Sequence, residues 1–321
     1  MVPRADIVAV QQEIPLGELL KVFKGAAHSR LVVYNDTLDD PLGMVHIRDL
    51  IAFMTARAAV DPEKPSRRKK QRIAGLDLGA HGLVRLPIAE KHGMIFVRPR
   101  PLQTDESVAI DIDAELGPIA GDLAALRLDT FPYYSTDRVQ PRINWKFAVD
   151  TFLEGYHIAH LHRKTIAPYF IGGAGTFDSA GLNGRMCVAK TSIDALRQHP
   201  EAERNYRKHV VAIYQIFPNT LIIWQLDHIE IWRAFPGRDD ASHCDVEMTI
   251  YKPQDSPRPD SYWEKNRDIA IRTVLEEDFP LGERMQIGFE SGATEEVIYG
   301  RNEPSLVHFH RSIRTALGVP A

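Results

Sequence analysis

Between Glu154 and His162 the chain places one carboxylate and three imidazoles within nine residues. The preceding residues, 144–153, carry apolar side chains at the spacing of a buried amphipathic helix, so this polar cluster is expected to leave water. Buried polar groups need partners, and a metal ion is the partner that satisfies several imidazoles at once. A single histidine on an apolar helix is usually a core residue, whereas three histidines beside a glutamate favour a metal site.

The spacing of these residues sets the local geometry. Each residue turns an α-helix by about 100°, so Glu154 and His157 share a helix face, whereas His157 and His162 do not. If both histidines bind one ion, the helix must therefore be irregular there. We expect a π-type bulge or a helix end between His157 and His162.

The same run carries the motif of a known family. Residues 144–146 read Asn-Trp-Lys, residues 152–157 read Phe-Leu-Glu-Gly-Tyr-His, and a second histidine follows at His162. This pattern resembles the mononuclear-iron motif of the Rieske non-haem iron ring-hydroxylating oxygenases, large (alpha) subunit. The resemblance implies that His157 and His162 bind iron and that Glu154 bridges this iron to the Rieske cluster of a neighbouring subunit. His160 has no role in the motif, so we expect it to pack or to surround the ligands.

Length and composition limit the class of protein. A chain of 321 residues, 44% hydrophobic and 26% charged, has the makeup of a two-domain globular protein without a membrane span. Its net charge of −4 disfavours nucleic acid as a partner, and the basic block at 67–70 is expected to be a solvated linker. Cys187 and Cys244 form no secretory framework, and Arg4 and Asp6 interrupt any signal peptide, so we expect a cytoplasmic protein.

The first 60 residues alternate in the order strand, helix, strand, strand, helix, with strands expected at 7–10, 30–34 and 43–46 and helices at 15–27 and 48–56. This order resembles the first CBS motif of haemolysin-like, CorC-type proteins, and so do the amino-acid sequences of residues 1–7, 28–31 and 40–50. The resemblance extends to about residue 80.

CBS motifs bind adenine nucleotides between two copies, and this sequence contains one. The resemblance places Asp49 at the ribose-binding acid, but His46 stands where a Ser or Thr is usual. Two interpretations remain: a nucleotide-binding module, or an incomplete module that binds nothing and pairs with a second copy through its exposed apolar face.

Residues 83–97 read as two strands joined by a polar turn and resemble the last hairpin of the oxygenases' Rieske domain. A Rieske [2Fe–2S] cluster needs two cysteines and two histidines, supplied in the family as Cys-x-His and Cys-x-x-His. Cys187 and Cys244 lie in neither pattern. The sequence therefore predicts a single CBS-like motif at 1–60, a linker at 61–81, a Rieske-hairpin remnant at 82–104 and a mononuclear-iron catalytic domain at 105–321.

Residues 105–321 read as an α+β domain. We expect a helix near 117–126, a glycine-rich loop at 172–175 and β segments at 210–217, 220–226, 228–235 and 244–251. Alternation in the last two predicts a sheet with one solvated face. A long helix at 261–287 completes the layers. The resemblance implies a helix-grip (START/Bet v 1-like) fold, in which a curved antiparallel sheet grips the long helix around a substrate pocket.

The predicted long helix carries an acidic run that ends at Asp278, shortly before Pro280. Proline removes a backbone donor and clashes with the preceding turn, so we expect a kink just after Asp278. An acidic run on a helix is usually a solvated face. The resemblance instead implies that Asp278 is the third iron ligand, with Glu277 as the alternative, because Glu283 and Gln286 continue the family pattern.

Two imidazoles and one carboxylate on one face of Fe(II) leave positions open for O₂ and substrate, as in non-haem iron oxygenases. The resemblance implies an enzyme that hydroxylates or oxidatively demethylates a small organic substrate, draws electrons from a reductase or ferredoxin, and forms a homotrimer. Without a Rieske motif in this sequence, activity of the chain alone is expected to be impaired. His308 and His310 alternate as in a strand and are expected to be surface or structural residues.

Two other interpretations remain open: a non-catalytic fusion protein that binds a small molecule or an adenine nucleotide, and a nonfunctional fusion. A fold by itself does not establish an activity.

Overall fold

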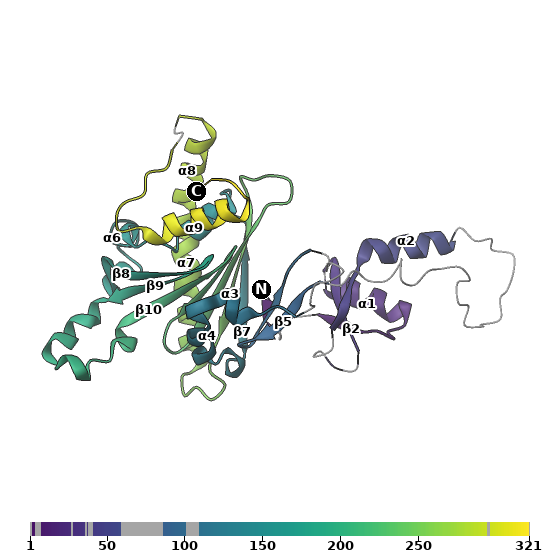
Figure 1. The fold of residues 1–321 in the computed structure, drawn as a ribbon, viewed down its shortest axis with the longest axis horizontal. Helices are drawn as coiled ribbons and strands as arrows, with labels where there is room; N and C mark the ends of the chain where they lie inside the picture. Colours follow the sequence, from purple (N-terminus) through teal and green to yellow (C-terminus); the bar gives the residue numbers. More distant parts are fainter. Residues whose placement is uncertain are drawn as a thin grey trace. The chain divides into compact units, whose positions relative to one another are not determined.

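The computed structural model describes residues 2–3, 8–26, 28–35, 37, 41–58, 86–100, 109–293 and 296–320. The chain divides into two compact units, Met1–Ile112 and Asp113–Ala321 (Figure 1). The predicted linker at 61–81, with its basic block, lies outside the described residues. None of the helices in the described part of the chain combines the length and the apolar character that a membrane span requires.

The first unit begins with the expected order of elements. These are β2 (Ala9–Gln11), α1 (Leu16–Ala26), β3 (Arg30–Tyr34), β4 (Pro41–His46) and α2 (Ile47–Ala58). Strand β3 lies at the centre of a three-stranded sheet, parallel to β2 and antiparallel to β4. A small core of alternating strand residues and helix residues fixes this arrangement: Val10, Phe23, Leu31, Val33 and Leu50 are buried together.

A second small sheet in this unit contains the predicted hairpin. Strands β5 (Ile88–Lys91) and β6 (Met94–Val97) pair in antiparallel fashion, and β1 (Val2–Pro3) pairs with β6. The turn uses left-handed backbone conformations, with φ of 53° at His92 and 75° at Gly93. The hairpin itself is confirmed, and its derivation from a Rieske domain stays a prediction.

The second unit is built on a seven-stranded sheet in which every neighbouring pair is antiparallel. The strand order is β7-β13-β12-β11-β10-β9-β8. The strands are β7 (Tyr133–Val139), β8 (Phe170–Ala180), β9 (Asn183–Lys190), β10 (Val210–Ile216), β11 (Thr220–Trp224), β12 (Ile229–Pro236) and β13 (Cys244–Tyr251). The four strands predicted between 210 and 251 are confirmed, whereas β7, β8 and β9 were not predicted.

The glycine-rich loop expected at 172–175 is instead part of strand β8. A Cβ atom added to Gly175 would lie 2.6 Å from the carbonyl oxygen of Cys187 on β9, closer than side chains approach backbone. Glycine is therefore required there by the close approach of two paired strands.

The expectation of one solvated sheet face is wrong for β12, because Ile229 to Ala234 are buried on both faces. The alternating polar residues of this strand have partners inside the protein. Trp232 Nε1 donates to Glu230 Oε2 at 2.9 Å, and Arg233 Nη2 lies 2.9 Å from Glu247 Oε2. Paired polar groups tolerate burial, so their alternation did not mark a wet face.

One continuous helical segment lies against the sheet (Figure 1). It consists of α7 (Asp260–Arg272), a π-helical turn (Thr273–Asp278) and α8 (Phe279–Glu290), which confirms the long helix expected at 261–287. Val274 and Phe279 share a core with Trp232 and Met248 of the sheet. This α+β arrangement of an antiparallel sheet and a long helix is the predicted one. The irregularity before Pro280 is a π-helical turn.

The remaining helices flank this core. They are α3 (Ile112–Leu116), α4 (Ala120–Leu126), α5 (Trp145–Asp150), α6 (Tyr156–Leu161) and α9 (Pro304–Ala316), with short 3₁₀ segments at Gly117–Ile119, Leu128–Thr130, Ala167–Tyr169, Thr191–Gln198, Glu201–Glu203 and Tyr206–His209. The strand-like reading of His308 and His310 is wrong, because both lie on α9. Leu306 and Phe309, three residues apart, are buried, which is the spacing of a helix face.

Candidate metal centre

The iron motif folds as two short helices rather than as one. Asn144 begins α5, where its side chain accepts a hydrogen bond from the backbone N–H of Lys146 at 3.0 Å, as N-cap residues do. Helix α5 ends at Asp150, and α6 starts at Tyr156. The expected helix end between the two histidines is present, because α6 stops at Leu161, directly before His162.

This helix end changes the direction of the second histidine. His162 has φ −92° and ψ 29°, outside the helical values, so its ring turns back toward His157. The centroids of the two rings lie 4.9 Å apart. Two imidazoles five residues apart therefore face one point, which a regular helix does not allow.

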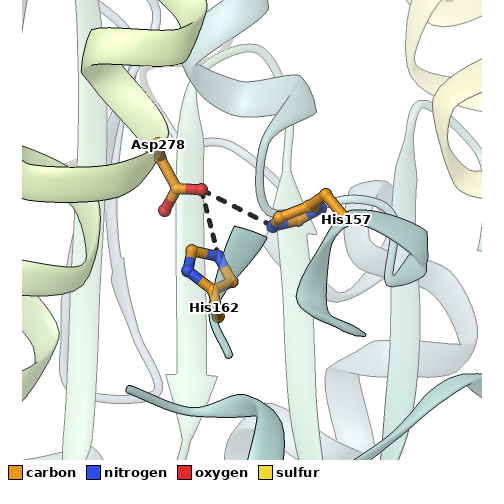
Figure 2. Close-up of side chains that lie close together, drawn as sticks. All are labelled: His157, His162 and Asp278. Atoms are coloured by element: carbon orange, nitrogen blue, oxygen red, sulfur yellow. Dashed lines mark ion pairs between the residues drawn. The ribbon is translucent and has the colours of Figure 1, made fainter. Parts of the chain in front are cut away.

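Asp278 meets the two histidines from the long helix (Figure 2). Its Oδ1 atom lies 3.1 Å from His162 Nε2 and 3.6 Å from His157 Nε2. The three ligand atoms all lie within 4.8 Å of one another, so this group could hold a metal ion. Asp278 stands at the last position of the π-helical turn, another element that is frequent at functional sites.

The other ring nitrogen of each histidine is held by a glutamate. His162 Nδ1 lies 2.6 Å from Glu277 Oε2, and the hydroxyl of Thr165 donates to the same oxygen at 2.6 Å. His157 Nδ1 contacts Glu154 Oε1. Because a carboxylate holds each Nδ1 atom, both Nε2 atoms face Asp278. A carboxylate at Nδ1 commonly orients an imidazole that binds a metal through Nε2. Glu277 therefore stands outside the group of three.

The site is largely buried, and burial and the neighbouring carboxylates together set the pKa values of its two imidazoles. His162 is 1% exposed and Asp278 is 8% exposed. Burial lowers the pKa of His157 to about 4, so this imidazole is neutral near pH 7. Burial also acts to lower the pKa of His162, but Asp278 and Glu277 outweigh it and raise that pKa above its ordinary value. A neutral imidazole is the form that binds metal.

Two cavities reach this centre. One of about 470 Å³ is lined by all three residues and extends between the sheet and α7. The other, of about 510 Å³, lies between α5, α8 and α9 and is also lined by Glu154, His157 and Asp278. A metal held by the three side chains would therefore border both cavities.

The other predicted residues lie elsewhere. Asp49 is exposed in the first turn of α2, and His46 Nδ1 accepts the backbone N–H of Arg48 at 3.0 Å. His160 was expected to pack or to surround the ligands, but it is exposed on α6. His308 and His310 are structural as expected, through hydrogen bonds of 2.9 Å to the carbonyl oxygen of residue 183 and to the carboxylate of residue 150.

Sequence reasoning missed a charged group beside the first cavity, of which Glu230 lines the cavity. His228 Nδ1 lies 2.7 Å from Asp227 Oδ1, and His228 Nε2 lies 3.4 Å from Glu230 Oε1. The neighbouring Asp-His pair followed by a glutamate two residues later was the available signal, but strand alternation indicated a solvated sheet face.

Comparison with curated proteins finds relatives of the first unit. The CBS domain model matches residues 1–56. "Hemolysin C" of Rickettsia prowazekii (strain Madrid E) is 40% identical over 58 residues, 18% of this chain and 19% of that protein. "Hemolysin C" of Brachyspira hyodysenteriae is 39% identical over 51 residues, 16% of this chain and 19% of that protein. The chain thus spans about a fifth of the length of these relatives.

Solved structures resemble most of the chain. The quaternary ammonium Rieske monooxygenase CntA in complex with an inhibitor aligns with a TM-score of 0.58 at 16% identity, covering 78% of this chain and 66% of that one. Naphthalene 1,2-dioxygenase with indole bound in the active site aligns with a TM-score of 0.51 at 16% identity, covering 75% and 66%. At these identities the likeness shows a shared fold, over less than two thirds of either solved chain.

The family comparison is the most extensive of these findings. The model of the ring hydroxylating alpha subunit (catalytic domain) matches residues 128–318, more than half of the chain, and this stretch contains His157, His162 and Asp278. Non-haem iron is the metal expected for this family. The chain belongs to the ring-hydroxylating alpha subunit family through its catalytic domain.

Proposed function

We propose that the second unit is an oxygenase domain in which His157, His162 and Asp278 bind one Fe(II). Two imidazoles and one carboxylate are the ligand set of non-haem iron oxygenases. The observation that carries the proposal is the convergence of two Nε2 atoms on Asp278 Oδ1, at 3.1 and 3.6 Å. Ligand atoms about 2.1 Å from a metal and at right angles to each other lie about 3 Å apart, so these separations suit one ion.

The state of Asp278 also fits a metal. Its Oδ1 atom is buried, and among the described residues it accepts no hydrogen bond of acceptable geometry despite its closeness to both imidazoles. A buried charged oxygen without a partner is costly, and a cation removes that cost. Glu277 and Glu154 would hold the two Nδ1 atoms and so fix both rings toward the ion.

A ferrous ion held in this way would supply the activation of O₂. The chain's own part is to bind and orient a small organic substrate in the first cavity. The middle of this cavity is apolar and includes Phe152, Ile213, Ile223 and Trp232, so it would exclude water from the reacting carbon. We propose hydroxylation or oxidative demethylation as the reaction, with Asp278 and the two imidazoles at one end of the bound substrate.

We further propose that electrons arrive from a reductase or ferredoxin through a Rieske donor, with Glu154 as the last protein group on the path. Glu154 supports this role because it contacts His157 Nδ1 and accepts the backbone N–H of His157 at 3.2 Å, while it also lines the second cavity. We propose that this donor belongs to a neighbouring subunit, as within a homotrimer, so that Glu154 would receive electrons across a subunit boundary.

The chain's parts are proposed with the boundaries that the sequence predicts. These are a CBS-like motif at 1–60, a linker at 61–81, a Rieske-hairpin remnant at 82–104 and the catalytic domain at 105–321. For the first part we propose no catalytic activity, and Asp49 is the candidate residue for binding an adenine nucleotide. The non-catalytic interpretation of the whole chain is less favoured, because it leaves the three converging ligand atoms without a role.

Iron analysis tests the proposal directly. The full chain, reconstituted anaerobically with Fe(II) and desalted, is expected to retain about one iron. His157→Ala and His162→Ala should each lose most of it, because each removes one of three ligands. His160→Ala is the matched control: this histidine lies on the same short helix but is exposed, so its loss should leave the iron content unchanged. Retention of iron by the His157→Ala/His162→Ala double variant would refute the proposal.

A further inference from the structure

The first cavity has three zones. Its metal end contains the two imidazoles and Asp278, and its middle is apolar. Tyr262, Lys265 and Asn266 line the cavity from α7, at least twelve residues before Asp278, and so form an end far from the metal. Lys190 lies at the same end, because the charge of Asp227, which Tyr262 contacts, acts on it. Gln225 and Glu230 also line the cavity. Polar groups placed at one end of an apolar cavity orient a ligand that has one polar group.

The sheet register directs Lys190 into this cavity. Along β9, Met186, Val188 and Lys190 are spaced two residues apart, so their side chains lie on the same face of the strand. All three line the cavity. Lys265 lines the same cavity from α7 on the opposite wall. Both lysines therefore line one cavity, but Lys190 is half-buried whereas Lys265 is exposed.

The negative groups at this end already have partners. Glu230 accepts from Gln225 Nε2 at 3.1 Å and from Trp232 Nε1 at 2.9 Å, and His228 Nε2 lies 3.4 Å away. Asp227 is held by His228 Nδ1 at 2.7 Å and by the hydroxyl of Tyr262. The protein therefore compensates these carboxylates itself.

The positive groups are not compensated in this way. Among the described residues no carboxylate lies within ion-pair distance of the ammonium of Lys190 or of Lys265. Burial lowers the pKa of Lys190, and the nearby charge of Asp227 offsets this in part. A partly buried ammonium without a partner gains from an anion brought to it.

We propose that Lys190 is the specificity-determining residue for a substrate that carries a carboxylate on an apolar body. The carboxylate pairs with Lys190 at the polar end, and the body extends through the apolar middle toward the metal end. Asn266 and Asp278 stand twelve residues apart on one helical segment, roughly 18 Å at about 1.5 Å per residue, so the carboxylate lies far from the metal. This inference rests on the proposed oxygenase for its reaction, but binding of the carboxylate does not require iron.

Calorimetry with three probes of one shape tests it. The full chain is titrated with 4-phenylbutyrate, 4-phenylbutanamide and 4-phenylbutylammonium, both with Fe(II) and with a chelator present. Wild-type protein is expected to bind the carboxylate most tightly in both conditions. Lys190→Met should weaken its binding about ten- to a hundred-fold, because a charge-assisted hydrogen bond is lost, and should leave the amide within about two-fold. Lys190→Arg should restore much of the preference.

Lys208→Met is the matched control, because this lysine is exposed and lines neither cavity. It should leave all three affinities unchanged. Tightest binding of the ammonium probe, equal losses for the carboxylate and the amide in Lys190→Met, or an equal effect of Lys208→Met would each overturn the inference. A chain that shows the carboxylate preference but retains no iron would support the inference while refuting the oxygenase proposal, so the two failures are distinguishable.

Discussion

Replacing Glu277 by glutamine tests how the chain orients its second histidine. Glu277 Oε2 receives both His162 Nδ1 and the hydroxyl of Thr165 at 2.6 Å. The substitution keeps the size of the side chain and removes its charge. The amide oxygen of glutamine can still accept a hydrogen bond from His162 Nδ1, but as a neutral group it is a weaker acceptor than the carboxylate. The imidazole therefore becomes less basic and less firmly oriented toward Asp278, although all three proposed ligands remain.

The expected cost follows from these contacts. Loss of a carboxylate that orients a metal-binding imidazole typically lowers metal affinity about 10- to 100-fold, or about 1.4–2.7 kcal/mol. Removal of a ligand costs more, so Glu277→Gln should fall between wild-type protein and His162→Ala. Competition with a chromophoric chelator under anaerobic conditions would measure the dissociation constant of Fe(II) for each variant.

Glu276→Gln supplies the control at the neighbouring position of the same π-helical turn. Glu276 is exposed, and its carboxylate is paired with Arg272 at 2.9 and 3.0 Å. This variant makes the same change in net charge without touching His162, so its iron affinity should match wild-type protein. Equal affinities for Glu277→Gln and Glu276→Gln would refute the role assigned to Glu277, and complete loss of iron in Glu277→Gln would indicate that it is itself a ligand.

Two further predictions concern stability. Burial acts to lower the pKa of His228, but its two carboxylate neighbours raise it to about 9, so the stabilisation should be full below about pH 6.5 and lost as pH rises through about 9. Urea unfolding should show a difference between wild type and His228→Gln of about 2–3 kcal/mol at pH 6 that shrinks by pH 9.5, and a constant difference would contradict this assignment. Gly175→Ala should destabilise by about 1–3 kcal/mol, because its Cβ would meet the carbonyl oxygen of Cys187. Gly121→Ala, on α4 with open space around it, should be neutral or stabilising in the same urea assay, and equal losses in both variants would contradict the steric argument.

Elements with strong local signals were predictable from the sequence. The helix over 261–287 and the four strands between 210 and 251 have clear periodicity, and the structure places them close to those bounds. The meeting of His157, His162 and Asp278 was expected from a motif and not from periodicity, because the last residue lies 116 positions beyond the second. Local patterns carry no information on such distant contacts.

The features that sequence reasoning missed depend on partners far along the chain. Strand β8 read as a loop because its glycines lower β propensity, and only its pairing with β9 explains them. Strand β12 read as half-solvated because its polar and apolar residues alternate. The structure buries these polar residues against partners on β13 and within β12 itself. The role of Glu277 depends on the position of His162, which directly follows helix α6 and lies 115 residues earlier in the chain.

The π-helical turn determines the direction in which the Asp278 carboxylate leaves the long helix. A π turn accommodates one residue more than an α turn over the same rise, and Asp278 closes this one. If the same six residues wound as a regular α-helix, Asp278 would lie about 100° further around the axis, away from both imidazoles. The direction of this carboxylate therefore depends on the π-helical winding, and a change that converts the turn to α-helical winding without removing a residue should weaken metal binding.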